Sequence, residues 1–337
     1  MKRALYIGIF SEGSTSKMRG EKLKSLLPGW QFDVIDTDIP FSKQPHLFRS
    51  LGFRYKTGPV IMAVNQFILE NLSFDHYKLV WIDKGIFLKK STIEAIRSKS
   101  EKLIHYTPDT AFYGNRSVMF NRSIDLYDYL ITTKSFELQN YRALISGHKI
   151  ILTTQGFDSD IHTPSVSFES KHNRVAFVGL GEKYRERIIQ NLLDNQINVA
   201  LAGHKWNSFV NRNRKSPFLD FKGTSLWNQN YVSLISSSYF ALGLLSKNFP
   251  ELHTTRTLEI PACGTALLTE KNEETSAIFS DQQAIFYKNF NDLVSKINYY
   301  QQHLDELSVV TNNGLNKVRG GGLDYISILD KILKTIL

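Results

Sequence analysis

Cysteine is scarce in this sequence, with Cys263 the single one in 337 residues. One cysteine excludes an internal disulfide framework and favours a reducing compartment such as the cytoplasm. Because Cys263 lies in an apolar turn, we expect it to be a small buried hydrophobic residue rather than a nucleophile.

Long apolar runs are also missing. The run at residues 239–245 is far too short to cross a bilayer. The N-terminus begins like a signal peptide, but its apolar segment ends at residues 11–13 and no cleavage site follows, so we interpret it as a first strand. Together with the single cysteine, these features predict a cytoplasmic protein.

Several functional motifs are absent. The sequence has no zinc-finger spacing, RNP-type motif, basic tail or basic helix with heptads, so nucleic acid is not an expected partner. We expect no metal cofactor. Neither candidate dinucleotide loop has the three glycines of G-x-G-x-x-G, since the first offers only Gly13 and Tyr184 replaces the third glycine of the second. A dehydrogenase is therefore excluded.

What is present describes a globular chain of two-domain size, with 42% hydrophobic and 22% charged residues. Its 41 basic and 32 acidic residues give a net charge of +9. Such a surface favours anionic partners, among which we consider nucleotide sugars and anionic lipids.

Two strand–loop–helix–strand patterns indicate two α/β halves. Residues 4–10 form an apolar strand, followed by a helical stretch at 17–27, and a second strand pattern restarts at 174–178 after a polar linker. Residues 40–60 look irregular. Ligands of open α/β sheets bind at the loops that follow the strands, so we expect the site there.

The most informative stretch is 251–270, which places Glu251 and Glu259 eight positions apart. We expect a helix from about Thr255, with Thr254 or Thr255 as its N-cap and Gly264 as its stop. An apolar strand then follows.

The start of this helix suits a diphosphate, because Thr254, Thr255 and Arg256 add two hydroxyls and a guanidinium to its free N–H groups. Glu259, one turn further on, can accept hydrogen bonds from two neighbouring hydroxyls such as those of a ribose. Lys247 and Arg185 are further candidates for the diphosphate, although each equally fits a solvated surface residue.

Residues 253–264, HTTRTLEIPACG, resemble the C-terminal signature of GT-B glycosyltransferases, and most of all the CgeB-like (spore maturation protein) group of the family-1/family-4 superfamily. The wider superfamily carries an E-x7-E motif, which Glu251 and Glu259 fit. Residues 81–85 (WIDKG), 106–109 (YTPD) and 155–164 also resemble segments of this group. Thr110 departs from the group's pattern, which has a second acid there.

The resemblance implies a GT-B fold, with two Rossmann-like domains facing across a cleft and a C-terminal helix crossing back to the first. We expect an acceptor-side domain at 1–155, a nucleotide-sugar-binding domain at 156–318 and the returning helix at 319–337. The implied activity is metal-independent glycosyl transfer of the hexosyltransferase type, with a nucleotide-diphosphate sugar as donor. A saccharide, a lipid-linked or a protein acceptor is compatible, as is a role in cell-envelope polysaccharide.

Candidate catalytic residues follow from this implied activity. Asp109 and Asp83 lie just past strand ends, and Glu12 lies in the first loop, so each is a candidate base for an acceptor hydroxyl. A turn aspartate that caps the next helix explains Asp83 and Asp109 equally well. A retaining mechanism needs no such base. Glu251 either supports the donor sugar or is an ordinary loop glutamate.

Backbone contacts are expected at two loops. Gly13 and Ser14 can bring N–H groups toward the donor phosphate or the acceptor, and Gly179 belongs to the first β–α unit of the nucleotide-binding half. His253 either hydrogen-bonds the donor or is a surface histidine.

Two segments, 48–56 and 206–214, are rich in aromatic and basic residues. Each can contact the inner face of an anionic membrane or a lipid-linked acceptor. Each can equally form a lid over the active site or be ordinary surface. Two rival functions stay open. One is a sugar-nucleotide 2-epimerase of the same fold, and the other is a non-catalytic carbohydrate- or envelope-binding module.

Overall fold

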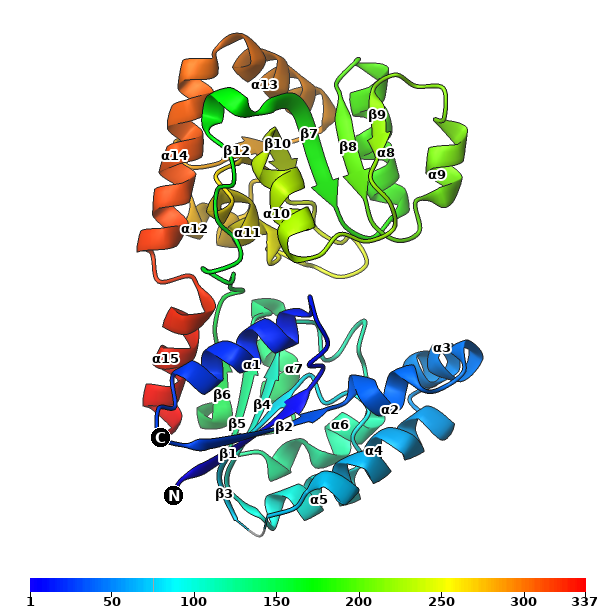
Figure 1. The fold of residues 1–337 in the computed structure, drawn as a ribbon, viewed down its shortest axis with the longest axis vertical. Helices are drawn as coiled ribbons and strands as arrows, with labels where there is room; N and C mark the ends of the chain where they lie inside the picture. Colours follow the sequence, from blue (N-terminus) through cyan, green and yellow to red (C-terminus); the bar gives the residue numbers. More distant parts are fainter. Residues whose placement is uncertain (75) are drawn as a thin grey trace. The chain divides into compact units, whose positions relative to one another are not determined.

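The computed structural model describes residues 1–74 and 76–337, which form two compact α/β units. The first unit comprises Met1–Thr154 and Ile326–Leu337, and the second comprises Gln155–Tyr325. Each unit has a six-stranded sheet with helices packed around it, and the strand pairs described are all parallel (Figure 1). The expected α/β class with two Rossmann-like sheets is confirmed.

The sheet of the first unit has the order β2-β1-β3-β4-β5-β6. Its strands are β1 (Arg3–Gly8), β2 (Gln31–Asp36), β3 (Tyr77–Asp83), β4 (Ser100–Thr107), β5 (Tyr129–Thr132) and β6 (Ile150–Leu152). Its helices are α1 (Thr15–Ser25), α2 (Asp38–Ser42), α3 (His46–Tyr55), α4 (Pro59–Asn71), α5 (Lys90–Arg97), α6 (Val118–Ser123) and α7 (Leu138–Arg142).

The sheet of the second unit has the order β12-β11-β10-β7-β8-β9. Its strands are β7 (His172–Val178), β8 (Val199–Ala202), β9 (Leu219–Phe221), β10 (Ser238–Leu242), β11 (Ala266–Glu270) and β12 (Ile285–Tyr287). Its helices are α8 (Lys183–Asp194), α9 (Asn207–Arg212), α10 (Asn228–Ser236), α11 (Arg256–Ala262), α12 (Glu273–Ile278), α13 (Phe290–Gln302) and α14 (Leu304–Gly320).

Each sheet has a point at which the direction of strand addition reverses. In the first unit β1 lies between β2 and β3, and in the second unit β7 lies between β8 and β10. The loops that follow the two strands flanking such a point diverge to opposite faces of the sheet, which opens a crevice for a ligand. The topology therefore marks β1/β3 and β7/β10 as the two places to search for binding sites.

The last helix, α15 (Tyr325–Ile336), belongs by its contacts to the first unit from Ile326 onward. Its apolar side chains are buried, namely Ile328, Leu329, Ile332, Leu333 and Ile336. These residues recur every three or four positions and so form one continuous apolar face. The chain thus completes the first sheet domain after it has built the second.

Two expectations about local structure are wrong. Residues 40–60 are mostly helical, because α2, α3 and the start of α4 lie there. The segment 206–214 contains α9, and Trp206 is fully buried against Phe177 and Phe209, so its large aromatic ring is core rather than a membrane or lid contact. Both stretches mix apolar and basic residues, so the sequence alone does not show a clear helical period there.

Candidate functional sites at the two sheet edges

In the second unit, Arg185 lies at the predicted crevice between β7 and β10. It extends from the first turn of α8, and its guanidinium donates to the carbonyl of Leu180, 3.1 Å away, and to that of Leu244, 3.4 Å away. These carbonyls belong to the loops that follow β7 and β10 respectively. Arg185 is thus a buried cation that joins the two loops, and not the solvated surface residue that was the alternative.

A second guanidinium lies close to the first. The pKa of Arg185 is lowered, primarily because the side chain is buried and secondly because the positive charge of Arg256 is near. Glu182, 3.3 Å from Arg185, and Glu251 act in the opposite direction. Two like charges held near each other in a partly dry crevice favour an anion between them.

Three buried donor atoms at this crevice lack a hydrogen-bond partner among the described residues: Arg185 Nε, Arg256 Nε and Thr254 Oγ1. Thr254 is 5% exposed and Arg185 4% exposed, so bulk water reaches neither freely. Leaving such a group unpaired costs about 1–3 kcal/mol. A ligand with several acceptor oxygens would satisfy the three atoms together.

The helix that follows these residues differs from expectation at its start. α11 has only seven residues, and its N-cap Thr255 has helical backbone angles and no side-chain capping bond. Its end is as predicted, because Gly264 has a φ of +69°, in the left-handed region that glycine adopts without strain. The donor groups that this stretch offers therefore belong to its side chains more than to the helix terminus.

Glu259 is buried in α11 and faces an aromatic residue of α10. Its Oε2 accepts a hydrogen bond of 3.0 Å from the hydroxyl of Tyr231, and its Oε1 lies 3.8 Å from Nε2 of His162. The second distance is longer than a hydrogen bond. Burial, and next the charge of Glu259, raise the pKa of Tyr231 far above its ordinary value, so Tyr231 remains a donor.

Two further predicted donor-site residues already have partners within the unit. Glu251 accepts a hydrogen bond of 2.9 Å from the backbone N–H of Ser246, which folds the loop after β10 back on itself. Lys247 forms an ion pair with Glu270 and is about half exposed. The ammonium of Lys247 has three N–H donors, so its ion pair does not by itself prevent contact with a ligand.

His253 and Gly179 both have hydrogen-bond partners within the second unit. His253 is buried, accepts from the backbone N–H of Gln155 over 3.1 Å and contacts Glu274 through its other nitrogen, so it is not a surface histidine. The N–H of Gly179 donates to the carbonyl of Ala202 over 2.9 Å. That N–H therefore has a protein acceptor, and the expected phosphate loop does not present it freely.

Cys263 is buried at the end of α11, as expected. Burial, and secondly the charge of Glu259, raise the pKa of its thiol well above the ordinary range. A thiol in this state is not a nucleophile at neutral pH.

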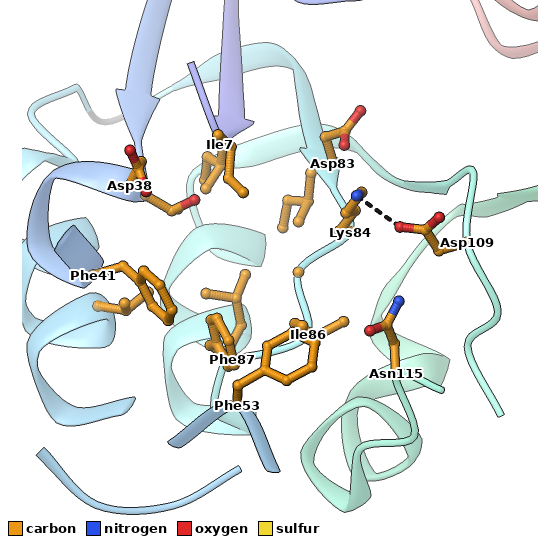
Figure 2. Close-up of a pocket in the computed structure, with 16 residues that line it drawn as sticks. Ile7, Asp38, Phe41, Phe53, Asp83, Lys84, Ile86, Phe87, Asp109 and Asn115 are labelled. Carbon is orange, nitrogen blue, oxygen red and sulfur yellow. Dashed lines mark ion pairs between the residues drawn. The ribbon is translucent and has the colours of Figure 1, made fainter. Parts of the chain in front are cut away.

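In the first unit, a cavity of about 280 Å³ lies at the crevice between β1 and β3. Its walls are largely apolar and include Ile7, Phe41, Phe53, Ile86 and Phe87 (Figure 2). Polar groups gather at its edge, as Figure 2 shows for Asp83, Lys84, Asp109 and Asn115. The cavity is close to the small end of ordinary ligand pockets.

Asp83 does not have the properties of a catalytic base. It is fully buried, and its two oxygens accept from Nε and Nη2 of Arg19 over 2.9 and 3.0 Å. Oδ2 also accepts from the hydroxyl of Tyr6 over 2.9 Å. Through these three hydrogen bonds Asp83 holds α1 to β1 and β3. It therefore has a structural role, and neither a catalytic base nor a helix cap describes it.

Asp109 forms the more open carboxylate at the same edge. Its Oδ2 lies 2.6 Å from Nζ of Lys84, and its side chain is about half exposed. Desolvation alone would raise the pKa of Asp109, but the charge and hydrogen bond of Lys84 outweigh it and the net pKa is lowered. Asp109 is therefore ionised at neutral pH and lines the cavity.

The loop after β1 contains the other predicted residues. Gly13 has a φ of +77°, and Ser14 is the N-cap of α1, with its hydroxyl accepting from the N–H of Lys17 over 3.1 Å. Glu12 is largely exposed and forms an ion pair with Lys17. The structure thus gives Ser14 a capping role and places Glu12 at the surface.

Three contact residues were not expected from the sequence. Lys84 and His162 lie inside the stretches that carried the resemblance, 81–85 and 155–164, so their position was a usable signal. Tyr231 lies in α10 with no motif around it. It meets Glu259 from 28 positions away, which only the folded chain reveals.

Over residues 1–74 and 76–337, no group of three or more His, Cys, Asp or Glu side chains is arranged to hold a metal ion. In the same part of the chain, no helix combines the length and the apolar character needed to cross a membrane.

Comparisons with known proteins place this geometry in context. A family model described as glycosyl transferase-like matches residues 185–334. No match was found among curated protein sequences.

Several solved structures share the whole fold. HepE of Anabaena in complex with UDP and glucose is 14% identical, with a TM-score of 0.66 and coverage of 99% of both chains. Sucrose-phosphate synthase from Thermosynechococcus elongatus is 12% identical, with a TM-score of 0.67 and coverage of 99% of this chain and 98% of that one. The α,α-trehalose 6-phosphate synthase of Burkholderia multivorans is 10% identical, with a TM-score of 0.63 and coverage of 100% and 98%. The chain therefore has the GT-B fold of glycosyltransferases, and its residues 185–334 are similar to a glycosyl transferase-like family.

Proposed function

We propose that this protein transfers a sugar from a nucleotide-diphosphate donor to an acceptor hydroxyl, with the donor bound by the second unit. One observation carries the proposal: at the β7/β10 crevice, Arg185, Arg256 and Thr254 each hold a buried donor atom that has no hydrogen-bond partner among the described residues. A diphosphate has the charge and the acceptor oxygens that these atoms require. The similarity of residues 185–334 to a glycosyl transferase-like family supports the same assignment.

The chemical step breaks the bond between the anomeric carbon and the diphosphate oxygen, and negative charge then grows on the leaving diphosphate. Arg185 and Arg256 stabilise that charge, and because the site is partly buried their effect is larger than in water. We expect the reaction to need no metal. Thr254 orients the phosphate by donating its hydroxyl hydrogen.

Glu259 is the proposed ribose-binding residue. Tyr231 holds one carboxylate oxygen, which fixes the side-chain rotamer and leaves Oε1 to accept from the ribose hydroxyls. Glu251, through its bond to Ser246, shapes the loop beside the donor sugar. Uridine diphosphate is the first nucleotide to test, because HepE of Anabaena was solved with UDP and glucose.

The acceptor side is the cavity of the first unit. In an inverting reaction Asp109 removes the proton from the acceptor hydroxyl, and Lys84 keeps the carboxylate ionised until the acceptor arrives. A saccharide, a lipid-linked saccharide or a protein side chain can bring that hydroxyl. The single, buried Cys263 fits a reaction in the reducing cytoplasm.

At the finer level, residues 253–264 lead us to infer that the chain belongs to the CgeB-like group, and the transfer of a hexose is our first choice of reaction. Metal-independent transfer at the cell envelope is the working hypothesis for its role.

Calorimetric titration with UDP, GDP, ADP, CMP and dTDP in EDTA tests the donor site. We expect one diphosphate to bind to the wild type, and Arg256→Ala and Glu259→Ala each to weaken binding at least about tenfold, or about 1.4 kcal/mol. Arg212→Ala is the matched control, since this exposed arginine pairs with Glu186 away from the crevice. Its affinity should equal that of the wild type.

Other outcomes would point elsewhere. If no nucleotide binds, the donor-site assignment is wrong and a non-catalytic carbohydrate- or envelope-binding module becomes the better description. If a sugar nucleotide binds and is converted into a free epimer without any acceptor, the protein is a 2-epimerase.

A further inference from the structure

Helix α3 (His46–Tyr55) is unusually exposed for a helix rich in apolar residues. Leu47 is 64%, Phe48 40%, Leu51 43% and Tyr55 60% exposed, while Gly52 is the one residue of the helix that is buried. Figure 1 shows α3 at one end of the first unit, next to the end of α4. A helix normally buries its apolar face, so this arrangement requires an explanation.

Four of the five exposed large apolar residues of α3 form one stripe, and the fifth, Phe53, is 47% exposed on another face of the helix. Residues 47, 48, 51 and 55 are separated by one, three and four positions, which keeps them within about 100° of the helix circumference. Gly52 lies against Val60 of α4, where an added Cβ would approach the Val60 side chain to 3.0 Å. Gly52 thus packs α3 closely against α4, while the apolar stripe of α3 faces away from the unit.

The stripe adjoins a basic groove. The groove, of about 550 Å³, is lined by Arg54, Lys56 and Arg116 together with Phe53, Tyr113 and Val118. None of the described residues that line it is acidic. α3 itself also contains no aspartate or glutamate. An apolar stripe bordered by cations alone is complementary to a surface that is apolar inside and anionic outside.

We propose that α3 and this groove bind the surface of an anionic lipid bilayer. Leu47, Phe48, Leu51 and Tyr55 enter the boundary between head groups and acyl chains, and Arg54, Lys56 and Arg116 contact the anionic head groups. Basic residues at such a surface attract the anionic head groups, and a short apolar stripe adds affinity in proportion to the area buried. The association is peripheral, because α3 lies on the bilayer and does not span it.

This surface also connects with the cavity described above. Phe53 lines both the groove and the cavity that Asp109 borders. The surface at α3 and the cavity therefore adjoin each other at Phe53 within one unit. The proposal does not depend on the donor site, because it rests on α3 and its neighbours alone.

Co-sedimentation with vesicles tests the proposal. Vesicles of phosphatidylglycerol and phosphatidylcholine should pellet the wild type, whereas vesicles of phosphatidylcholine alone should not. The double variant Leu47→Glu, Leu51→Glu should lose at least about tenfold in affinity for the anionic vesicles. The control is Met62→Glu, Leu69→Glu, which changes two exposed apolar residues of α4 and adds the same charge. It should lose no more than about threefold.

Circular dichroism and thermal melting of both double variants establish that each is folded, and a third variant separates charge from apolar contact. Arg54→Gln, Lys56→Gln, Arg116→Gln should retain its fold and lose most of its binding to anionic vesicles. If the wild type does not bind anionic vesicles, or if both double variants weaken binding equally, the proposal is wrong. A dimer in solution that Leu47→Glu, Leu51→Glu dissociates would show instead that the stripe contacts a second copy.

Discussion

The crevices of the two units lie at equivalent points of similar sheets, but the buried charged side chains at the two crevices are paired differently. At β7/β10 the second unit places Arg185 and Arg256 with unpartnered donor atoms. At β1/β3 the first unit also places a buried arginine, Arg19, but there Asp83 accepts from it through both oxygens. Apolar side chains surround the cavity beside this pair.

This difference shows how one architecture yields two kinds of site. Where a carboxylate of the same chain accepts from a buried cation through both of its oxygens, the pair serves structure and the space beside it can be apolar. Where guanidinium nitrogens of two neighbouring arginines have no acceptor among the described residues, an external anion can supply one. The topology thus predicts where a ligand binds, and the pairing of buried charges predicts which ligand binds there.

The largest expected effect is on the internal pair. Asp83→Ala leaves Arg19 buried without its carboxylate, which should cost the first unit about 3–5 kcal/mol of folding free energy. Hydrogen exchange read by mass spectrometry reports each unit separately and should show lost protection in the first unit only, that is in residues 1–154 and 326–337. Glu101→Ala, which breaks an exposed pair with Lys78, is the control and should leave protection in the first unit unchanged. Equal loss of protection in both units would contradict the comparison.

The next effect concerns chemistry at the first crevice. Asp109→Asn should lower the rate of sugar transfer about a hundredfold, while nucleotide affinity at the second crevice stays unchanged. Lys84→Met should raise the pKa of Asp109, because desolvation then acts without the opposing cation, and the acid limb of the pH–rate profile should move to higher pH. Kinetics across pH together with nucleotide titration measure both. An unchanged rate in Asp109→Asn would rule out Asp109 as the base.

A buried histidine makes the folding stability of the first unit depend on pH. His105 packs against Phe120 and Tyr127, and burial lowers its pKa from 6.5 to about 4. Between these values the unfolded chain binds a proton that the folded chain does not, so stability rises with pH across this window. On acidification from pH 6.5 to about 4, the first unit should therefore lose about 2–3 kcal/mol through this residue.

Denaturant unfolding at several pH values measures this dependence when wild type and His105→Gln are compared. The variant should lose less stability on acidification. His148→Gln, a change at an exposed histidine of the same unit, should behave as the wild type does. Identical acid sensitivity in the His105 variant and the wild type would assign the effect to other groups.

The smallest expected effect lies in the second crevice. Tyr231→Phe removes the hydroxyl that holds Glu259 and should weaken nucleotide binding about fivefold, close to 1 kcal/mol. The same titration used for Glu259→Ala measures it. A loss larger than that of Glu259→Ala would mean that Tyr231, and not Glu259, contacts the nucleotide.

Much of this organisation was predictable from residue order. The strands β1, β3, β7 and β11 are apolar on both faces, and Gly264 ends α11 where the turn needs its left-handed conformation. The helix α3 was missed because its apolar residues face outward, so their spacing matched no expected core. Asp83 was misread because its partner Arg19 lies 64 positions away, and no local pattern joins two such residues.

The return of the chain in α15 has a consequence for synthesis on the ribosome. The second unit is one continuous segment, Gln155–Tyr325, and can fold as soon as it has emerged. The first unit needs Ile326–Leu337, which are made afterwards, to cover its last apolar surface. The domain that is translated first is therefore completed last, and during that interval its uncovered surface is open to chaperones or to misfolding with neighbouring chains.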